Sequence, residues 1–156
     1  MILLKYILLK SKRRIYPRGT SRFLIDGGSQ ITICNDIKFL HNYREEKPSF
    51  NAESFSGHSL DLRGYGYLIL NFDDFYFQLQ CWYQPDAAIN LISGCYLDDH
   101  DCMVNKINSD PNEYVLQYKQ RSIPIITVDG LKFITSSEII LPPEKKKIYS
   151  VHTLSL

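Results

Sequence analysis

The sequence has little that commits it to a membrane, to a disulfide framework or to a highly charged partner. Its 18 Lys and Arg against 17 Asp and Glu give a formal net charge of +1, so no overall field favours nucleic acid or an anionic surface. Only four cysteines occur, and none forms a CxxC pair. Scattered cysteines without a secretory signal indicate reduced thiols in a cytoplasmic setting. These cysteines are Cys34, Cys81, Cys95 and Cys102.

Apolar runs of membrane length are also absent. The stretch MILLKYILL at residues 1–9 is interrupted by Lys5, and it is far shorter than the roughly 20 residues that a bilayer demands. Basic residues follow this stretch rather than precede it, which is the wrong polarity for a signal peptide. We interpret residues 1–21 as a leader or an N-terminal strand, and we expect no membrane partner.

Short strand-forming segments make up most of the remaining sequence. Aromatic residues reach 13% and apolar residues 44%, which argues against disorder. Runs rich in β-branched and aromatic residues, separated by turn formers, are typical of a barrel or sandwich. Helical periodicity is weak and limited to residues 36–43 and to a segment beginning near Ile92. The predicted strands cover residues 22–25, 30–34, 60–62, 65–72, 76–83, 114–118, 123–128 and 131–134.

The length and the composition predict one main domain with an extension. A chain of 156 residues suffices for a single moderate core. A composition shift at residues 103–111 separates a main domain, residues 22–104, from a β-rich extension, residues 105–156, with a loose tail after Leu141. The sequence contains no internal repeat, so a site that needs two copies of one motif requires two chains.

The segment FLIDGGS at residues 23–29 is the sharpest local feature. An apolar strand delivers the Asp26 carboxylate into a turn that contains Gly27 and Gly28. Taken alone, Asp-Gly between two strands is a common hairpin signal, so a purely structural turn is the alternative interpretation. The motifs that follow Asp26 in the sequence favour a functional site over a purely structural turn.

Those motifs follow in a fixed order: ND at 35–36, LHNY at 40–43, RGYGY at 63–67, YQP at 83–85 and NLIS at 90–93. Their order and spacing resemble the protease region of copia-type LTR retrotransposon polyproteins, particularly those of the yeast Ty group. In that family an apolar strand ends in Asp-Thr/Ser-Gly, and Asp26-Gly27-Gly28-Ser29 stands at this position. The residues after 103 resemble, more faintly, the segment between protease and integrase.

The resemblance implies a retropepsin-like closed barrel with one or two short helices. It implies an aspartic endopeptidase, in which Asp26 from each of two protomers activates a water molecule without a metal or organic cofactor. Gly28 and Ser29, together with Gly57 at the tip of a flap over residues 54–59, would bind the substrate. The implied partners are a second copy of the chain and peptide segments of a Gag-Pol-type precursor, in the cytoplasm or in the virus-like particle of an active element.

Position 27 departs from the family pattern, because glycine replaces the expected Thr or Ser. The family's hydroxyl is implied to cross-link the two active-site loops by hydrogen bonds worth about 1 kcal/mol each. Glycine also destabilises an ordered loop by ~0.5 to 1 kcal/mol relative to alanine. Two copies together lose more than about 3 kcal/mol, which weakens a marginal dimer by more than roughly a hundredfold. A weak or inactive protease-derived β domain, acting as an interaction module, is therefore the alternative.

Two further chemistries are disfavoured by the sequence. Cys95, His100 and Cys102 match no usual spacing of zinc ligands, so we predict no metal site. The Tyr and Phe residues of segment 65–83 have no basic stripe beside them and are interrupted by Asp73 and Asp74. This pattern favours core strands over a surface that stacks on nucleic-acid bases.

Overall fold

Strands dominate the structure, which confirms the predicted mostly β class. The computed structural model describes residues 22–54 and 56–142, and the predictions for residues 1–21 and for the tail beyond residue 142 lie outside this part. The elements are β1 (Arg22–Asp26), β2 (Thr32–Cys34), η1 (Ile37–Phe39), β3 (His41–Glu45), β4 (Gly64–Phe72), β5 (Phe75–Tyr83), β6 (Asn90–Ser93), α2 (Gly94–Asp99), β7 (Cys102–Ser109), β8 (Asn112–Tyr118), β9 (Arg121–Val128), β10 (Leu131–Thr135) and η2 (Ser136–Glu138).

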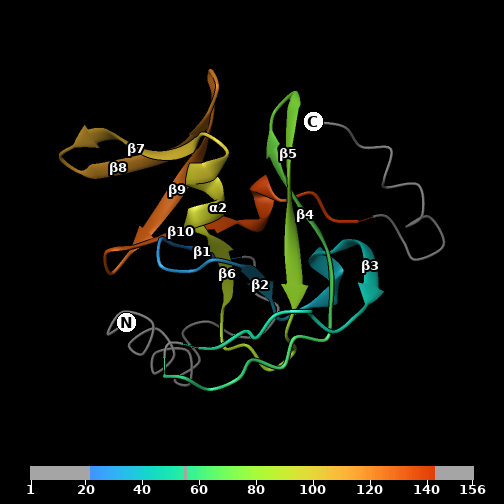
Figure 1. The fold of residues 1–156 in the computed structure, drawn as a ribbon. Coiled ribbons are helices and arrows are strands. Elements are labelled where there is room, and N and C mark those ends of the chain that lie inside the picture. Colours follow the sequence, from blue (N-terminus) through green and yellow to red (C-terminus); the bar gives the residue numbers. More distant parts are fainter. Residues whose placement is uncertain (1–21, 55, 143–156) are drawn as a thin grey trace.

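All ten of these strands belong to one strongly bent sheet, in the order β3-β4-β5-β2-β6-β1-β10-β9-β8-β7 (Figure 1). The described sheet is open, with β3 and β7 as its edges. The predicted closed barrel is therefore not observed. The chain after β10 instead returns to β4. Leu70 and Ile139 form an antiparallel bridge, and the Ile140 amide donates to the Ile69 carbonyl at 3.0 Å.

The strands on either side of the Asp26 loop are held together by β6. β1 pairs with β6 in parallel, with Asp26 opposite Ser93. β2 pairs with β6 in the antiparallel sense and with β5 in parallel. Because β6 lies between β1 and β2, the loop that joins them, residues 27–31, passes over the end of β6.

The β4–β5 hairpin supplies the longest strands, and its sequence explains its form. Nine residue pairs run in continuous register from Gly64 opposite Tyr83 to Phe72 opposite Phe75. The tight turn between them uses Asp73 at a φ of 62°, a left-handed conformation that Asp tolerates better than most residues. Alternation along β5 buries Phe77, Leu79 and Cys81 on one face.

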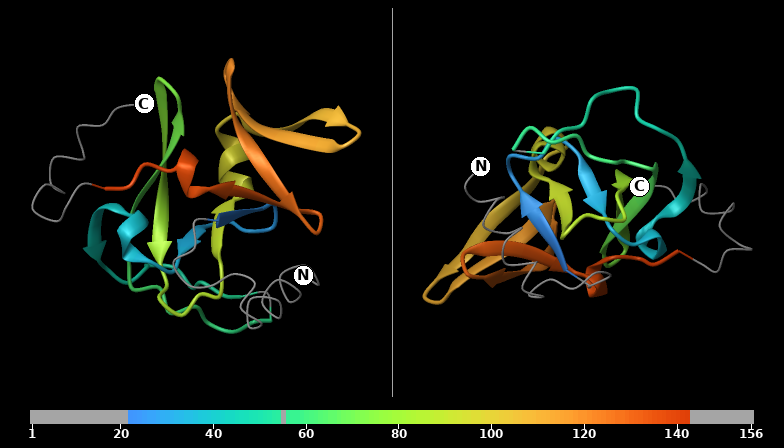
Figure 2. Two further views of the ribbon diagram at one scale, coloured as in Figure 1. Left: turned by 180° about the vertical axis from the view of Figure 1, so that it is seen from behind. Right: turned by 90° about the horizontal axis from the view of Figure 1, so that it is seen from below.

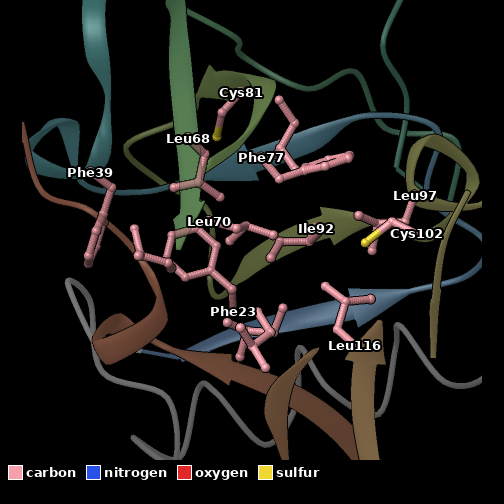
Figure 3. Close-up of a cluster of buried hydrophobic side chains, with 14 of the residues drawn as sticks. Phe23, Phe39, Leu68, Leu70, Phe77, Cys81, Ile92, Leu97, Cys102 and Leu116 are labelled. Atoms are coloured by element: carbon pink, nitrogen blue, oxygen red, sulfur yellow. The ribbon is translucent and has the colours of Figure 1, made fainter. Parts of the chain in front are cut away.

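The main core lies beneath this hairpin (Figure 3). Phe23 of β1, Leu70 of β4, Ile92 of β6 and Leu116 of β8 are all fully buried in one cluster. The domain boundary predicted after residue 104 falls inside β7. Strands from both sides of it share the core, and β10 pairs with β1 in antiparallel register.

Several local predictions need correction. The helix predicted over residues 36–43 is limited to η1, because the residues from His41 onward pair with β4 as β3. Residues 60–62 lack the strand predicted there, although Leu62 is buried against Trp82. The sequence signals did not predict β7. The helix expected near Ile92 begins at Gly94 as α2. Within residues 22–54 and 56–142, no helix has the length and apolarity needed to cross a membrane.

Candidate active site

The Asp26 carboxylate stands at the end of β1, in a tight turn that fixes its orientation. Its Oδ1 accepts a hydrogen bond from the Gly28 amide at 2.9 Å. The Asp26 carbonyl accepts a second one from the Ser29 amide at 3.2 Å. Asp26 is half-buried, while Gly27 and Gly28 are exposed. The turn therefore presents a carboxylate at the surface of one protomer while holding it in place.

Ser93 ties this loop to the strands and to the helix behind it. Its buried hydroxyl donates to the Ser29 carbonyl at 2.7 Å and accepts from the Tyr96 amide at 3.0 Å, as the N-cap of α2. The Ser93 amide donates to the Thr32 hydroxyl at 3.0 Å. One residue thus connects the middle of the Asp26 loop and the first residue of β2 to α2, which restricts the movement of the loop.

Gly94 packs directly against the loop backbone, although no sequence pattern singled it out. A Cβ at this position would lie 2.7 Å from the Gly27 Cα and 2.9 Å from the Asp26 carbonyl oxygen. Real side chains do not approach backbone so closely, so only glycine fits without a shift of the loop. The available signal in the sequence was the Ser93-Gly94 pair after an apolar strand.

Gly27, the departure from the family pattern, is not imposed by packing. A Cβ built at Gly27 would meet no heavy atom within 4 Å, and the residue does not adopt a positive φ. Its carbonyl accepts a weak hydrogen bond from the Cys95 thiol, with 3.4 Å between sulfur and oxygen. A single protomer therefore has room for Thr or Ser at position 27.

The two loop residues predicted to bind substrate lie beside the carboxylate. A Cβ on Gly28 would make only an ordinary 3.5 Å contact with Asp26 Oδ1, so any need for glycine here comes from a ligand or a second protomer. The Ser29 hydroxyl donates to the Ile31 carbonyl at 2.6 Å. Its hydroxyl proton serves the loop itself, and its oxygen keeps acceptor capacity.

The segment predicted as a flap forms a hairpin, in which residues 52–54 pair with residues 58–60. The Ser54 amide donates to the His58 carbonyl at 2.7 Å, and the Leu60 amide donates to the Ala52 carbonyl at 2.8 Å. Gly57 has a φ of +82°, which favours glycine over other residues. The hairpin lies on the same side of the molecule as the loop after β1, in Figure 1 and in both views of Figure 2.

The cysteines and histidines near α2 do not converge. Cys102 is buried, and this burial raises the pKa of its thiol to about 12, so the thiol is neutral at ordinary pH. His100 stacks on Tyr96 with ring centroids 4.0 Å apart. In the part of the chain that the structure describes, no group of three His, Cys, Asp or Glu side chains is placed to hold a metal ion.

Comparisons with known proteins add no assignment. No protein-family model, no curated protein and no solved structure matched the chain. The residues and the geometry of the Asp26 loop are therefore the basis for assigning a function.

Proposed function

We propose that the chain is an aspartic endopeptidase of the retropepsin type, which processes a Gag-Pol-like precursor as a homodimer in the cytoplasm or in a virus-like particle. The observation that carries the proposal is the construction of the Asp26 loop. A carboxylate is oriented by the Gly28 amide, and its loop is fixed from behind by Ser93 and Gly94. The bond from the Gly28 amide is common in Asx-turns, and the contacts of Ser93 and Gly94 fix the loop in addition to it.

The proposed chemistry requires a second carboxylate. Two carboxylates that face each other at close range cannot both ionise cheaply, so they share one proton. The ionised one draws a proton from a bound water, which attacks the peptide carbonyl, while the protonated one donates a hydrogen bond to the developing oxyanion. This reaction uses no metal or organic cofactor.

The second carboxylate is Asp26 of another protomer, because the sequence offers this motif once. A twofold axis between the two Asp26 loops makes the interface isologous. Dimerisation is then a precondition of activity. Exposed Gly27 and Gly28 permit close approach of the two loop backbones.

The hairpin over residues 52–60 is the proposed flap. It lies on the same side of the molecule as the Asp26 loop (Figure 2), and in the proposal it covers a peptide bound at that loop, with Gly57 at the turn. Closure of such a hairpin over a bound peptide excludes water from the reacting carbonyl.

The proposal is tested by cleavage of a precursor-derived polypeptide at mildly acidic pH. Asp26→Asn removes the ionisable group at similar size, so cleavage is lost while the protein stays folded, and a statine-type peptide inhibits the unmodified protein. Cleavage that persists at full rate in Asp26→Asn would contradict the assignment.

The rival function is a non-catalytic, protease-derived β domain that acts as an interaction module, and Gly27 favours it. The loop carries no hydroxyl at this position to cross-link two protomers. Because the site has room for a larger residue, Gly27→Thr distinguishes the two functions. Increased cleavage supports a weakened protease, and folded variants that all fail to cleave support the rival.

A further inference from the structure

An open pocket lies on the outer face of the β4–β5 hairpin, and its lining combines polar residues with three aromatic side chains. It has a volume of about 470 Å³, and its walls are residues 46–50 on one side and Tyr65, Gln80 and Trp82 on the other. A smaller pocket of about 80 Å³ shares Gln80 and Trp82 and extends to residues 30–32, at the end of the Asp26 loop and the start of β2. The two pockets therefore lie next to each other, with Gln80 and Trp82 lining both.

The sequence explains why aromatic rings gather here. Alternation along β5 directs Cys81 into the core and leaves Gln80 and Trp82 on the opposite face. Tyr65 stands opposite Trp82 in the β4–β5 register, with ring centroids 5.2 Å apart. Phe50 approaches Trp82 edge to face at 5.4 Å. Three rings therefore form one surface contributed by two strands and a loop.

Phe50 is the part of this surface that a purely structural role explains least. It is 42% exposed, whereas Trp82 is 7% exposed. Trp82 already belongs to an apolar cluster with Ile33 and Leu62, against which Leu60 and other side chains pack. An aromatic side chain held over the pocket and still open to solvent gains burial when an apolar group enters.

The polar groups around the pocket carry no single sign of charge. Glu46 and Lys47 are neighbours at its rim, so their charges offset one another, and the Gln80 amide is neutral. This balance favours a neutral ligand over an acidic or a basic one.

We propose that this pocket binds a large apolar or aromatic side chain of the peptide substrate and so sets sequence preference. The inference rests on the proposed function, because it places an extended peptide across the Asp26 loop. The neighbouring pocket supports it, because the smaller pocket is lined by residues 30–32 near the Asp26 loop and shares Gln80 and Trp82 with the larger one. A strand-like peptide advances about 3.3 Å per residue, so neighbouring side chains of one extended peptide can reach adjacent pockets.

Trp82 is the single tryptophan of the chain, and its fluorescence reports directly on the pocket. The probe is a series of ten-residue peptides with one Phe or one Ser placed at each position in turn, titrated up to millimolar concentration into the Asp26→Asn variant. Binding is thus measured without cleavage. At one or two positions Phe shifts the Trp82 emission and binds about fivefold to tenfold more tightly than Ser.

Phe50→Ala removes this preference for Phe, whereas Ile107→Ala, which changes an exposed apolar residue on β7, retains it. No difference between Phe and Ser peptides, or an unchanged preference in Phe50→Ala, would overturn the inference. Cleavage by the unmodified protein is scored separately with the same peptides. Cleavage without a Phe preference overturns only the pocket, a Phe preference without cleavage overturns only the protease, and the absence of both overturns both.

Discussion

The Asp26 loop and the β7–β9 strands are stabilised in different ways. The loop relies on directional contacts, with the Ser93 hydroxyl and the close packing of Gly94 fixing its backbone. The β7–β9 strands rely on burial of one face. Their inner side chains, such as Leu116, are fully buried, whereas Met103 and Ile107 on β7 are 52% and 61% exposed. Directional contacts hold a group in one position, whereas apolar burial on one face tolerates changes on the other.

The largest expected effect concerns the one-sided packing of β7–β9. Leu116→Ala leaves a cavity in the main core and lowers the free energy of unfolding by about 2 to 5 kcal/mol. Ile107→Ala, on the exposed side of the same strands, changes it by less than about 0.5 kcal/mol. Urea denaturation measures both. Similar losses for the two variants would show that the outer face is covered as well, so that the two regions would not differ in this way.

The next effect concerns the contact between Gly94 and the Asp26 loop. Gly94→Ala places a methyl group against the Gly27 backbone, and this overpacking lowers stability by about 1 to 3 kcal/mol. Gly27→Ala is the matched control, because its Cβ meets open space. The control is expected to leave stability unchanged or to raise it by about 0.4 to 1 kcal/mol. Thermal or urea denaturation measures both, and a tolerated Gly94→Ala would mean that the loop has room to move.

A smaller effect concerns the hydrogen bonds of Ser93. Ser93→Ala removes the N-cap of α2 and leaves the Ser29 carbonyl without this donor, for a loss of about 1 to 2 kcal/mol. Ser54→Ala in the exposed hairpin serves as the control and is expected to cost less. Amide hydrogen exchange of residues 26–32 locates the effect. Faster exchange in Ser93→Ala alone is expected, and unchanged exchange would count against the role of Ser93.

His41, a buried histidine outside both regions, makes the folding stability depend on pH. Burial lowers the pKa of His41, although the hydrogen bond between its Nε2 and the Ile140 carbonyl acts in the opposite direction. The unfolded imidazole titrates near 6.5, so at lower pH the unfolded state binds more protons than the folded one. The contribution of neutral His41 to the free energy of unfolding is therefore fully present above about pH 6.5. It decreases as the pH falls below that value.

His41→Gln is expected to weaken this dependence, because the amide cannot titrate. His58→Gln is the control, since His58 is exposed. Denaturant midpoints between about pH 7.5 and 5, a range that brackets the ordinary pKa of histidine, measure the slope for each variant. A slope that His41→Gln leaves unchanged would assign the pH dependence to other groups.

The sequence predicted the elements whose signals are local. The β4–β5 hairpin follows from long runs of aromatic and aliphatic residues around Asp73-Asp74, and the Asp26 turn follows from an apolar strand that ends in glycines. β7 was missed because its edge position leaves a polar pattern, with only Cys102 buried along its length. β3 was mistaken for part of a helix because its partner strand β4 is distant along the chain.

The parts of the candidate site that were missed depend on contacts between distant segments. Gly94 meets Gly27 only because β6 pairs with β1, and the Ser93-Gly94 pair after an apolar strand does not by itself identify this distant partner. The sequence placed Trp82 in an ordinary core strand. Its position in a pocket arises because residues 46–50 pass over β5, a path that composition does not determine.

The proposed active site contains Asp26 from two protomers, and a mixing experiment tests this requirement. Unmodified protein and Asp26→Asn are combined in equal amounts, allowed to exchange, and assayed for cleavage at constant total concentration. If both carboxylates are needed, about a quarter of the dimers remain active and the rate falls to about a quarter of that of the unmodified protein. A rate of about half would mean that each chain acts alone, which would contradict an active site shared by two protomers.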